Sequence, residues 1–303
     1  MPDVIHTPVL LQEVLEALNP KPGQCFIDAT ANGGGHTFAL WDRVKPNGMI
    51  LAIDKDHDLV ERLTREARER KANVIAVAGS YGDLAAIASA YNVTNVAGIL
   101  FDLGYSSYHI DQSGRGFSFQ KDEPLLMRYE SEGSTKGGMT AAEAVNQLSE
   151  EELADIIYQY GEDRLARRIA STICVARKRG RILTTKQLAD IVAQAYPKRM
   201  FSRINPATKT FQALRIFVNQ ELAELERVLP QARDILAEDG VIAIITFHSL
   251  EDRIVKRFFQ SEKGNQLDII TKKPIVPTPQ EAHENRRARS AKLRVAVKKH
   301  TIQ

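Results

Sequence analysis

Short apolar runs alternate with amphipathic segments over the first hundred residues. The apolar runs lie at 25–30, 48–54, 73–79 and 96–103. Segments with apolar residues at three- and four-residue spacing lie between them, at 37–43, 58–71 and 83–90. The runs have the length of buried strands, and the spacing of the other segments predicts helices. This alternation predicts right-handed crossovers and a parallel sheet covered by helices on both faces.

The alternation stops after residue 104. Residues 105–205 contain no comparable apolar run, and a loop rich in Gly, Ser and Asp is followed there by helical patterns. Three of these helices are predicted to begin at Ser or Thr followed three residues later by Glu or Gln, the capping-box arrangement. The pairs are Thr140 with Glu143, Ser149 with Glu152, and Thr184 with Gln187. We therefore predict an inserted all-helical domain at 105–205.

Strand patterns resume after the insertion. Asn205-Pro206 suits a helix start followed by one apolar stripe from Leu214 to Leu225, and a second helix is predicted from Pro230 to Gly240. The last candidate strands are the apolar runs at 241–247, 267–273 and 291–299. The expected fold class is therefore α/β, with seven strands supplied by residues 1–104 and 206–303.

Composition indicates an ordinary globular protein, with 43% hydrophobic and 26% charged residues. No run of about 18 apolar residues could span a membrane, and the first residues lack a signal-peptide pattern, so we expect a cytoplasmic protein without membrane contact. Cys25 and Cys174 lie far apart and outside any Cys/His cluster, which predicts buried reduced thiols and no metal site.

Positive charge is concentrated near the C-terminus. The overall net charge is +3, yet nine Lys and Arg residues stand against Glu281 and Glu284 within residues 271–303. Such a segment either serves solubility or contacts the phosphates of a nucleic acid.

A glycine-rich turn follows the first predicted strand. The segment 31–36 reads Ala-Asn-Gly-Gly-Gly-His and leads into a helix, where backbone amides can approach a ligand. Asp54 ends the next strand, where a carboxylate can accept hydrogen bonds from the hydroxyls of a ribose. A dinucleotide site would need a third glycine where Phe38 stands, so that interpretation is the weaker alternative. The second alternative is that the glycine-rich turn is only a connection and binds no ligand.

Three acids, Asp28, Asp54 and Asp102, end three of the predicted strands. Each alone could merely cap a turn, but their convergence at the carboxyl edge of one sheet predicts a ligand site. Tyr81 follows the third strand at the same edge and could pack on an adenine, although a lone aromatic residue is more often part of a core.

Several blocks of the sequence resemble the MraW family of bacterial 16S rRNA methyltransferases, in order and over nearly the whole chain. They are HTPVLL at 6–11, DLG with SS at 102–107, RGFSF at 115–119, NPATKTFQALRI at 205–216, FHSLEDR at 247–253 and RSAKLR at 289–294.

The resemblance implies a seven-stranded Rossmann-like methyltransferase sheet with a helical substrate-recognition insertion, and S-adenosylmethionine as methyl donor. It further implies 16S rRNA in the 30S subunit as substrate, N4 of cytosine 1402 in the decoding centre as target, and a homodimer. The donor-binding residues implied by position are Gly34, Gly35, His36, Asp54, Tyr81, Asp102 and His109. Two positions depart from the family: Asn32 replaces a glycine but tolerates left-handed backbone, and His109 replaces a Gln.

Methylation of a cytosine amine requires help, because the nitrogen lone pair is delocalised into the ring. An enzyme must orient the amine and accept its proton. Asp102 is the candidate acceptor, with the carbonyls of Leu103 and Gly104 as helpers. His248, just past the fifth strand, could relay a proton, bind the base or serve a structural role.

RNA contacts are expected on both parts of the chain. Phe117 and Phe119, beside Arg115, could stack on an unstacked base or instead anchor their loop. The candidate phosphate contacts are Arg286, Arg287, Arg289, Lys292 and Arg294, and they predict binding that weakens steeply with salt. A small-molecule methyltransferase and a non-catalytic RNA-binding assembly factor are the competing hypotheses.

Overall fold

The computed structural model describes residues 8–104, 106–130, 138–197 and 205–300. The chain forms two compact units, one made of residues 1–106 and 222–303 and the other of residues 107–221. We call them the sheet unit and the inserted unit. The second boundary differs from the predicted one at 205/206, because the helix at 207–219 packs within the hydrophobic core of the inserted unit through Phe211 and Leu214.

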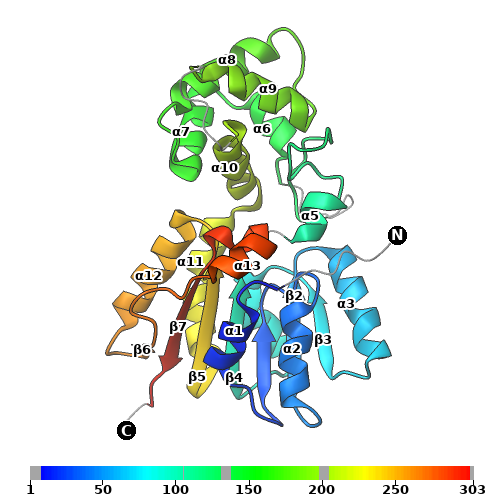
Figure 1. The fold of residues 1–303 in the computed structure, drawn as a ribbon, viewed down its shortest axis with the longest axis vertical. Helices are drawn as coiled ribbons and strands as arrows, with labels where there is room; N and C mark the ends of the chain where they lie inside the picture. The colour runs from blue at the N-terminus through cyan, green and yellow to red at the C-terminus, as the bar shows by residue number, and fades with distance from the viewer. Residues whose placement is uncertain (1–7, 105, 131–137, 198–204, 301–303) are drawn as a thin grey trace. The chain divides into compact units, whose positions relative to one another are not determined.

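The sheet unit contains one seven-stranded sheet with the order β3-β2-β1-β4-β5-β7-β6 (Figure 1). The strands are β1 (Cys25–Asp28), β2 (Met49–Asp54), β3 (Val74–Ala78), β4 (Val96–Asp102), β5 (Leu236–Thr246), β6 (Leu267–Ile269) and β7 (Lys292–Lys298). The first five run parallel, and β7 is antiparallel to both β5 and β6. The predicted strands and the α/β fold class are confirmed.

Alternate side chains of the strands face two helical layers. Ile50 of β2 packs with α1 (Leu11–Leu18) and α2 (Gly35–Val44), whereas Leu51 belongs to the core that includes α4 (Leu84–Ala90), α11 (Glu221–Ile235) and α12 (Ser249–Glu262). The remaining elements of this unit are α3 (His57–Glu69), α13 (Pro279–Glu284) and the 3-10 helices η1 (Tyr81–Asp83) and η3 (Arg286–Ser290). Strand order reverses between the neighbours β1 and β4, and open α/β sheets bind ligands at the carboxyl edge of such a point.

The helices before β5 correct two predictions. The stripe expected from Leu214 to Leu225 is broken, because Gln220 adopts left-handed backbone (φ 52°) and separates α10 (Ala207–Asn219) from α11. The helix predicted to end at Gly240 already ends at Ile235, and Leu236 pairs with Val96 of β4. A Cβ at Gly240 would lie 3.0 Å from the Val96 carbonyl oxygen, so this glycine permits close strand approach and does not end a helix.

The inserted unit is helical in its described part, as predicted. Its elements are α5 (Ser107–Asp111), α6 (Ala141–Gln147), α7 (Glu150–Gly161), α8 (Ala166–Arg177), α9 (Thr185–Ala195) and α10. All three predicted capping boxes form, at Thr140, Ser149 and Thr184. Each box satisfies two backbone amides that a helix start would otherwise leave without an acceptor.

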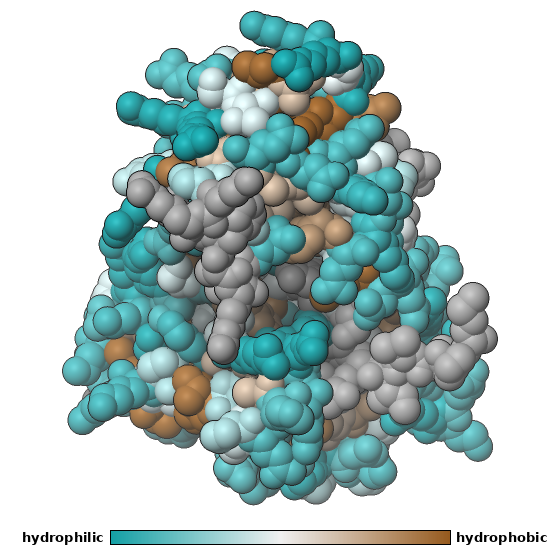
Figure 2. Space-filling model, turned by 45° about the horizontal axis from the view of Figure 1, so that its top comes forward, coloured by the Kyte–Doolittle hydropathy of each residue, from teal (hydrophilic) through white to brown (hydrophobic). Residues whose placement is uncertain are grey.

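Surface properties agree with the composition. Figure 2 shows a mostly hydrophilic face interrupted by small hydrophobic patches, and no described helix has the length and apolar character to cross a membrane.

Both cysteines are free thiols; Cys174 is buried as predicted, whereas Cys25 is only partly buried.

Candidate functional site

The glycine-rich turn after β1 is closely packed. Asn32 adopts the left-handed backbone (φ 48°) expected of it, and Gly34 (φ 82°) caps the start of α2. A Cβ on Gly34 would lie 2.8 Å from Leu63 Cδ1, and one on Gly35 would lie 2.8 Å from Pro8 Cγ. Larger residues would therefore displace the turn, which presents backbone at the carboxyl edge of the sheet.

Asp54 at the end of β2 ties this turn to the sheet. Its Oδ2 accepts the N–H of Asn32 at 2.7 Å and its Oδ1 accepts the N–H of Asp56 at 2.9 Å. Burial raises the pKa of Asp54 to about 7, against the effect of these two hydrogen bonds. Each carboxylate oxygen can accept more than one hydrogen bond, so Asp54 keeps capacity for ligand hydroxyls.

Asp102 at the end of β4 is buried, with 1% of its surface exposed, and neither carboxylate oxygen has a hydrogen-bond partner within the described residues. Its backbone N–H donates to Thr30 Oγ1 at 2.6 Å, which fixes the strand end. Burial raises the pKa of Asp102 against the opposing charge of Arg287, and with a smaller contribution from Glu251 the pKa is about 7. A buried carboxyl group without partners is costly, which is typical of a site whose partner is a ligand.

His36 lies beside the Asp102 side chain. The ring Nε2 lies 3.1 Å from the Val9 carbonyl oxygen, which can only accept, so Nε2 carries a proton. Nδ1 lies 3.6 Å from Asp102 Oδ2. Burial lowers the pKa of His36 despite the opposing charge of Asp28, so the neutral ring turns an acceptor nitrogen toward Asp102. The His36 ring therefore borders the Asp102 carboxyl group without forming a hydrogen bond to it.

Asp28 has a different environment from Asp102. Its Oδ2 accepts from Thr37 Oγ1 at 2.6 Å, and its Oδ1 accepts from the Thr30 N–H at 3.3 Å. Burial raises the pKa of Asp28. The three acids thus converge as predicted, but Asp28 fastens α2 to β1, and Asp102 alone of the three lacks hydrogen-bonded carboxylate oxygens.

Tyr81 lies in η1, directly after β3. Its ring packs edge-on against Phe101 with centroids 6.1 Å apart, and Lys55 Nζ lies 5.9 Å from the ring centroid. Tyr81 is therefore attached to the core by one edge, and its stacking on an adenine stays a prediction.

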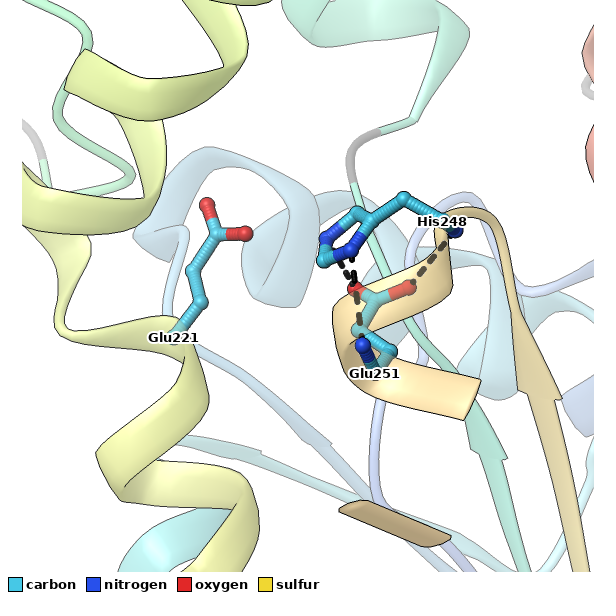
Figure 3. A group of neighbouring side chains, drawn as sticks. All are labelled: Glu221, His248 and Glu251. Atoms are coloured by element: carbon cyan, nitrogen blue, oxygen red, sulfur yellow. Dashed lines mark hydrogen bonds and ion pairs between the residues drawn. The ribbon is translucent and has the colours of Figure 1, made fainter. Parts of the chain in front are cut away.

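His248 caps the first turn of α12 together with Glu251 (Figure 3). Its Nδ1 accepts the Glu251 N–H at 3.4 Å, while Glu251 Oε2 accepts the Phe247 N–H at 2.8 Å. In the neutral ring Nε2 then carries the proton; it lies 3.1 Å from Glu251 Oε1 without hydrogen-bond geometry. His248 thus has a structural role and a free donor. Glu221, also drawn in Figure 3, belongs to the inserted unit and pairs there with Arg215 at 2.8 Å.

The predicted phosphate contacts do not share one environment. Arg286 and Arg289 are exposed, and Lys292 is 40% exposed. Arg294 differs from the prediction, because it is buried in β7 and its Nε donates to Asp252 Oδ1 at 2.7 Å. Arg287 is partly buried, with its guanidinium 5.9 Å from the Phe247 ring centroid, and its charge acts on Asp102 and His36.

The predicted aromatic contacts of the inserted unit lie inside it. Phe117 is buried and stacks on Tyr129 with centroids 5.2 Å apart, and His109 is buried against both rings. Phe119 packs edge-on against Phe211, while Arg115 Nη1 donates to the Tyr129 carbonyl oxygen at 2.6 Å. This packing matches the alternative in which the aromatic residues anchor their loop. Base stacking and the donor contact of His109 stay predictions.

Sequence reasoning missed Thr30 and Glu251. Thr30 accepts the Asp102 N–H, and Glu251 raises the pKa of the same residue while capping α12. Thr30 follows β1 at the carboxyl edge, a position that could have marked it. Glu251 stands three residues after His248, the spacing of a capping box with an unusual first residue.

Replacing Asp102 by Asn should change how stability depends on pH. The folded pKa of about 7 exceeds the value of about 4 in an unfolded chain, so the wild type loses stability as pH rises between these values. The amide does not titrate. As pH rises from about 4 to about 8, the melting temperature of D102N should therefore increase by a few degrees relative to that of ligand-free wild type. Scanning calorimetry at both pH values measures the two melting temperatures. A difference between D102N and wild type that does not change with pH would contradict the burial of the Asp102 charge.

The chain is similar to known proteins over nearly its whole length. Residues 3–299 match the model of the MraW methylase family. The ribosomal RNA small subunit methyltransferase H of Deinococcus radiodurans is 47% identical, over 97% of this chain and 90% of its own length. The protein of the same name from Persephonella marina is 45% identical, over 97% of this chain and 99% of its own. A crystal structure of an rRNA methylase from Streptococcus thermophilus aligns with a TM-score of 0.47 at 10% identity, over 98% of this chain and 99% of that one.

Proposed function

The chain belongs to the MraW methylase family, and from that premise we propose that it transfers a methyl group from S-adenosylmethionine to the N4 amine of a cytosine in small-subunit 16S rRNA. The nucleotide implied by the family resemblance is cytosine 1402 of the decoding centre. The substrate in this proposal is the 30S subunit, and the acting enzyme is cytoplasmic and forms a homodimer.

The observation that carries the proposal is the buried carboxyl group of Asp102, which has no hydrogen-bond partner among the residues that the structure describes. It ends β4 next to the point where strand order reverses, and the glycine turn lies at the end of the neighbouring β1. A group in this position can meet both a bound donor and an incoming amine, and its pKa of about 7 suits proton acceptance near neutral pH.

The residues at this edge fit S-adenosylmethionine. Gly34 and Gly35 leave no room for a Cβ, because Leu63 and Pro8 occupy that space, and the turn is therefore held close against its neighbours at the carboxyl edge. Asp54 would hold the ribose hydroxyls, and Tyr81 would pack on the adenine. When bound, S-adenosylmethionine supplies an electrophilic methyl group. Donor contacts from His36, Asp102 and His109 complete the proposed set.

Proton acceptance is the chemical task of the chain itself. The amine nitrogen gains a methyl group and loses one proton, and the Asp102 carboxylate accepts that proton. His36 is held by the hydrogen bond from its Nε2 to the Val9 carbonyl oxygen, and its Nδ1 lies 3.6 Å from Asp102 Oδ2 without a hydrogen bond. His248 stays the second candidate for contact with the base.

RNA recognition is divided between the two units in this proposal. The inserted unit would recognise the substrate, with the partly exposed Phe119 at its loop, while the buried Arg115 would support that loop through the Tyr129 carbonyl oxygen. The sheet unit would hold phosphates through Arg286, Arg289 and Lys292.

Methyl transfer from labelled S-adenosylmethionine tests the proposal. Small subunits isolated from cells lacking the gene should accept the label as N4-methylcytidine, identified by mass spectrometry of the nucleosides. A metabolite extract should not accept it. Label in the extract alone would instead indicate a small-molecule methyltransferase, and subunit binding without any transfer would indicate an assembly factor.

A further inference from the structure

A cavity of about 390 Å³ lies beside His248 in the sheet unit. Its walls are the β5–α12 turn at 247–249, the connection at Val276 and Pro277, Ala282 of α13, and residues 289–292. Because β5 ends at Thr246 and pairs there with Lys292, the cavity lies at the same sheet edge as Asp102. Its volume lies within the range of about 300–1,000 Å³ typical of small-molecule sites.

The cavity carries positive charge. Arg289 uses only Nε, which donates to the Ala282 carbonyl oxygen at 3.2 Å, so its two terminal nitrogens have no partner within the described residues. Lys292 Nζ lies 3.4 Å from Asp252 Oδ2, but Arg294 already binds that carboxylate through two hydrogen bonds. Two cations thus share one acid. No carboxylate is among the lining residues, and the neighbouring acids Asp252 and Glu251 lie against Lys292 and His248.

A hydrogen-bond donor and an apolar wall complete the cavity. The side chain of His248 is 9% exposed, and its Nε2 has no hydrogen-bond partner within the described residues. Because Nδ1 accepts the Glu251 N–H, Nε2 is the donor nitrogen; it lies 3.1 Å from Glu251 Oε1 but makes no hydrogen bond there. Val276, in contrast, exposes 57% of its surface although it is apolar. Cation, donor and apolar wall together match the phosphate, polar edge and flat face of a nucleotide.

We propose that this cavity binds a nucleotide of the RNA substrate that neighbours the target base. The phosphate lies on Arg289 and Lys292, a polar group of the sugar or base accepts from His248 Nε2, and the remaining face packs on Val276. Single-stranded RNA is commonly recognised through such splayed nucleotides. The inference rests on the proposed function, because it requires an RNA substrate.

A second basic cavity supplies the matched control. Lys256, Lys263 and Lys272 line a space of about 230 Å³ between α12 and β6, which is smaller than the common range for ligand sites. These lysines make no side-chain hydrogen bond or ion pair within the described residues, so K256A removes a comparable charge from the same unit.

Fluorescence anisotropy with a labelled single-stranded oligoribonucleotide, together with methylation of small subunits, tests the inference. R289A should weaken RNA affinity about tenfold and reduce the slope of log affinity against log salt by about 1, as loss of one phosphate contact does. A282W, which fills the cavity, should weaken affinity similarly. The RNA affinity of K256A should stay within about twofold of the wild-type value. Calorimetric affinity for S-adenosylmethionine should be unchanged in all three.

Wild-type RNA affinity in both R289A and A282W would overturn the inference. An equal loss in R289A and K256A would also overturn it, because diffuse attraction would then explain the binding. If R289A and A282W weaken RNA binding while wild type transfers no methyl group to subunits, the cavity stands and the proposed function fails.

Discussion

Replacement of Asp102 by Asn should lower kcat for methylation of small subunits about 1,000-fold, because loss of a positioned proton acceptor typically costs about 10²- to 10⁴-fold. The amide has nearly the same shape as the acid but cannot accept the amine proton as a carboxylate does. Measurement at saturating S-adenosylmethionine separates this chemical defect from any loss of donor binding. The remaining activity should also lose the rise with pH that ionisation of a group with a pKa of about 7 gives to wild type.

Asp28→Asn is the matched control for this variant. Asp28 ends the neighbouring strand, but its oxygens already accept from Thr37 and Thr30, so its replacement should reduce stability and leave kcat within about tenfold of wild type. Near-wild-type kcat in D102N, or equal losses in both variants, would exclude Asp102 as the proton acceptor.

Asp54→Asn should weaken S-adenosylmethionine affinity about 10- to 100-fold, the effect expected when charged hydrogen bonds to two hydroxyls are lost. The amide also turns an N–H group toward a backbone donor, because both oxygens of Asp54 accept backbone N–H groups of Asn32 and Asp56. Isothermal titration calorimetry measures the affinity, and kcat at saturating donor should change far less than KM.

Asp58→Asn provides the comparison for Asp54. Asp58 lies four residues later in the first turn of α3 and is partly exposed, so the variant makes the same chemical change away from the glycine turn. Donor affinity should match wild type. If D54N bound S-adenosylmethionine as tightly as D58N does, the ribose contact assigned to Asp54 would be wrong.

Local patterns predicted the sheet and the caps because both depend on neighbouring residues. Strands such as β2 alternate apolar side chains between two buried faces, and capping boxes such as Thr140 with Glu143 need only a three-residue spacing. The boundary after α10 was not predictable in this way. Its stripe resembles that of α11, but the left-handed backbone of Gln220 ends α10, and Phe211 and Leu214 pack in the core of the inserted unit.

The candidate site was predictable as a set of strand ends, but the roles of its members were not. Asp28 and Asp102 look alike in sequence. They differ because Thr37, in the first turn of α2, donates to Asp28, whereas no hydrogen-bond donor reaches the Asp102 side chain within the described residues. Arg294 was predicted to contact a phosphate because the sequence likewise does not show which partner the fold brings to its side chain. Its partner Asp252 lies 42 residues earlier and is brought beside it by the pairing of β5 with β7.

The central claim is that the edge formed by the glycine turn, Asp54 and Asp102 binds S-adenosylmethionine with its methyl group toward Asp102. A crystal structure of the protein with this ligand tests the claim most directly. In that structure the ribose hydroxyls should bind Asp54, the backbone at Gly34 and Gly35 should contact the ligand, and the methyl group should face the end of β4. Ligand bound elsewhere, or a methyl group directed away from Asp102, would contradict it.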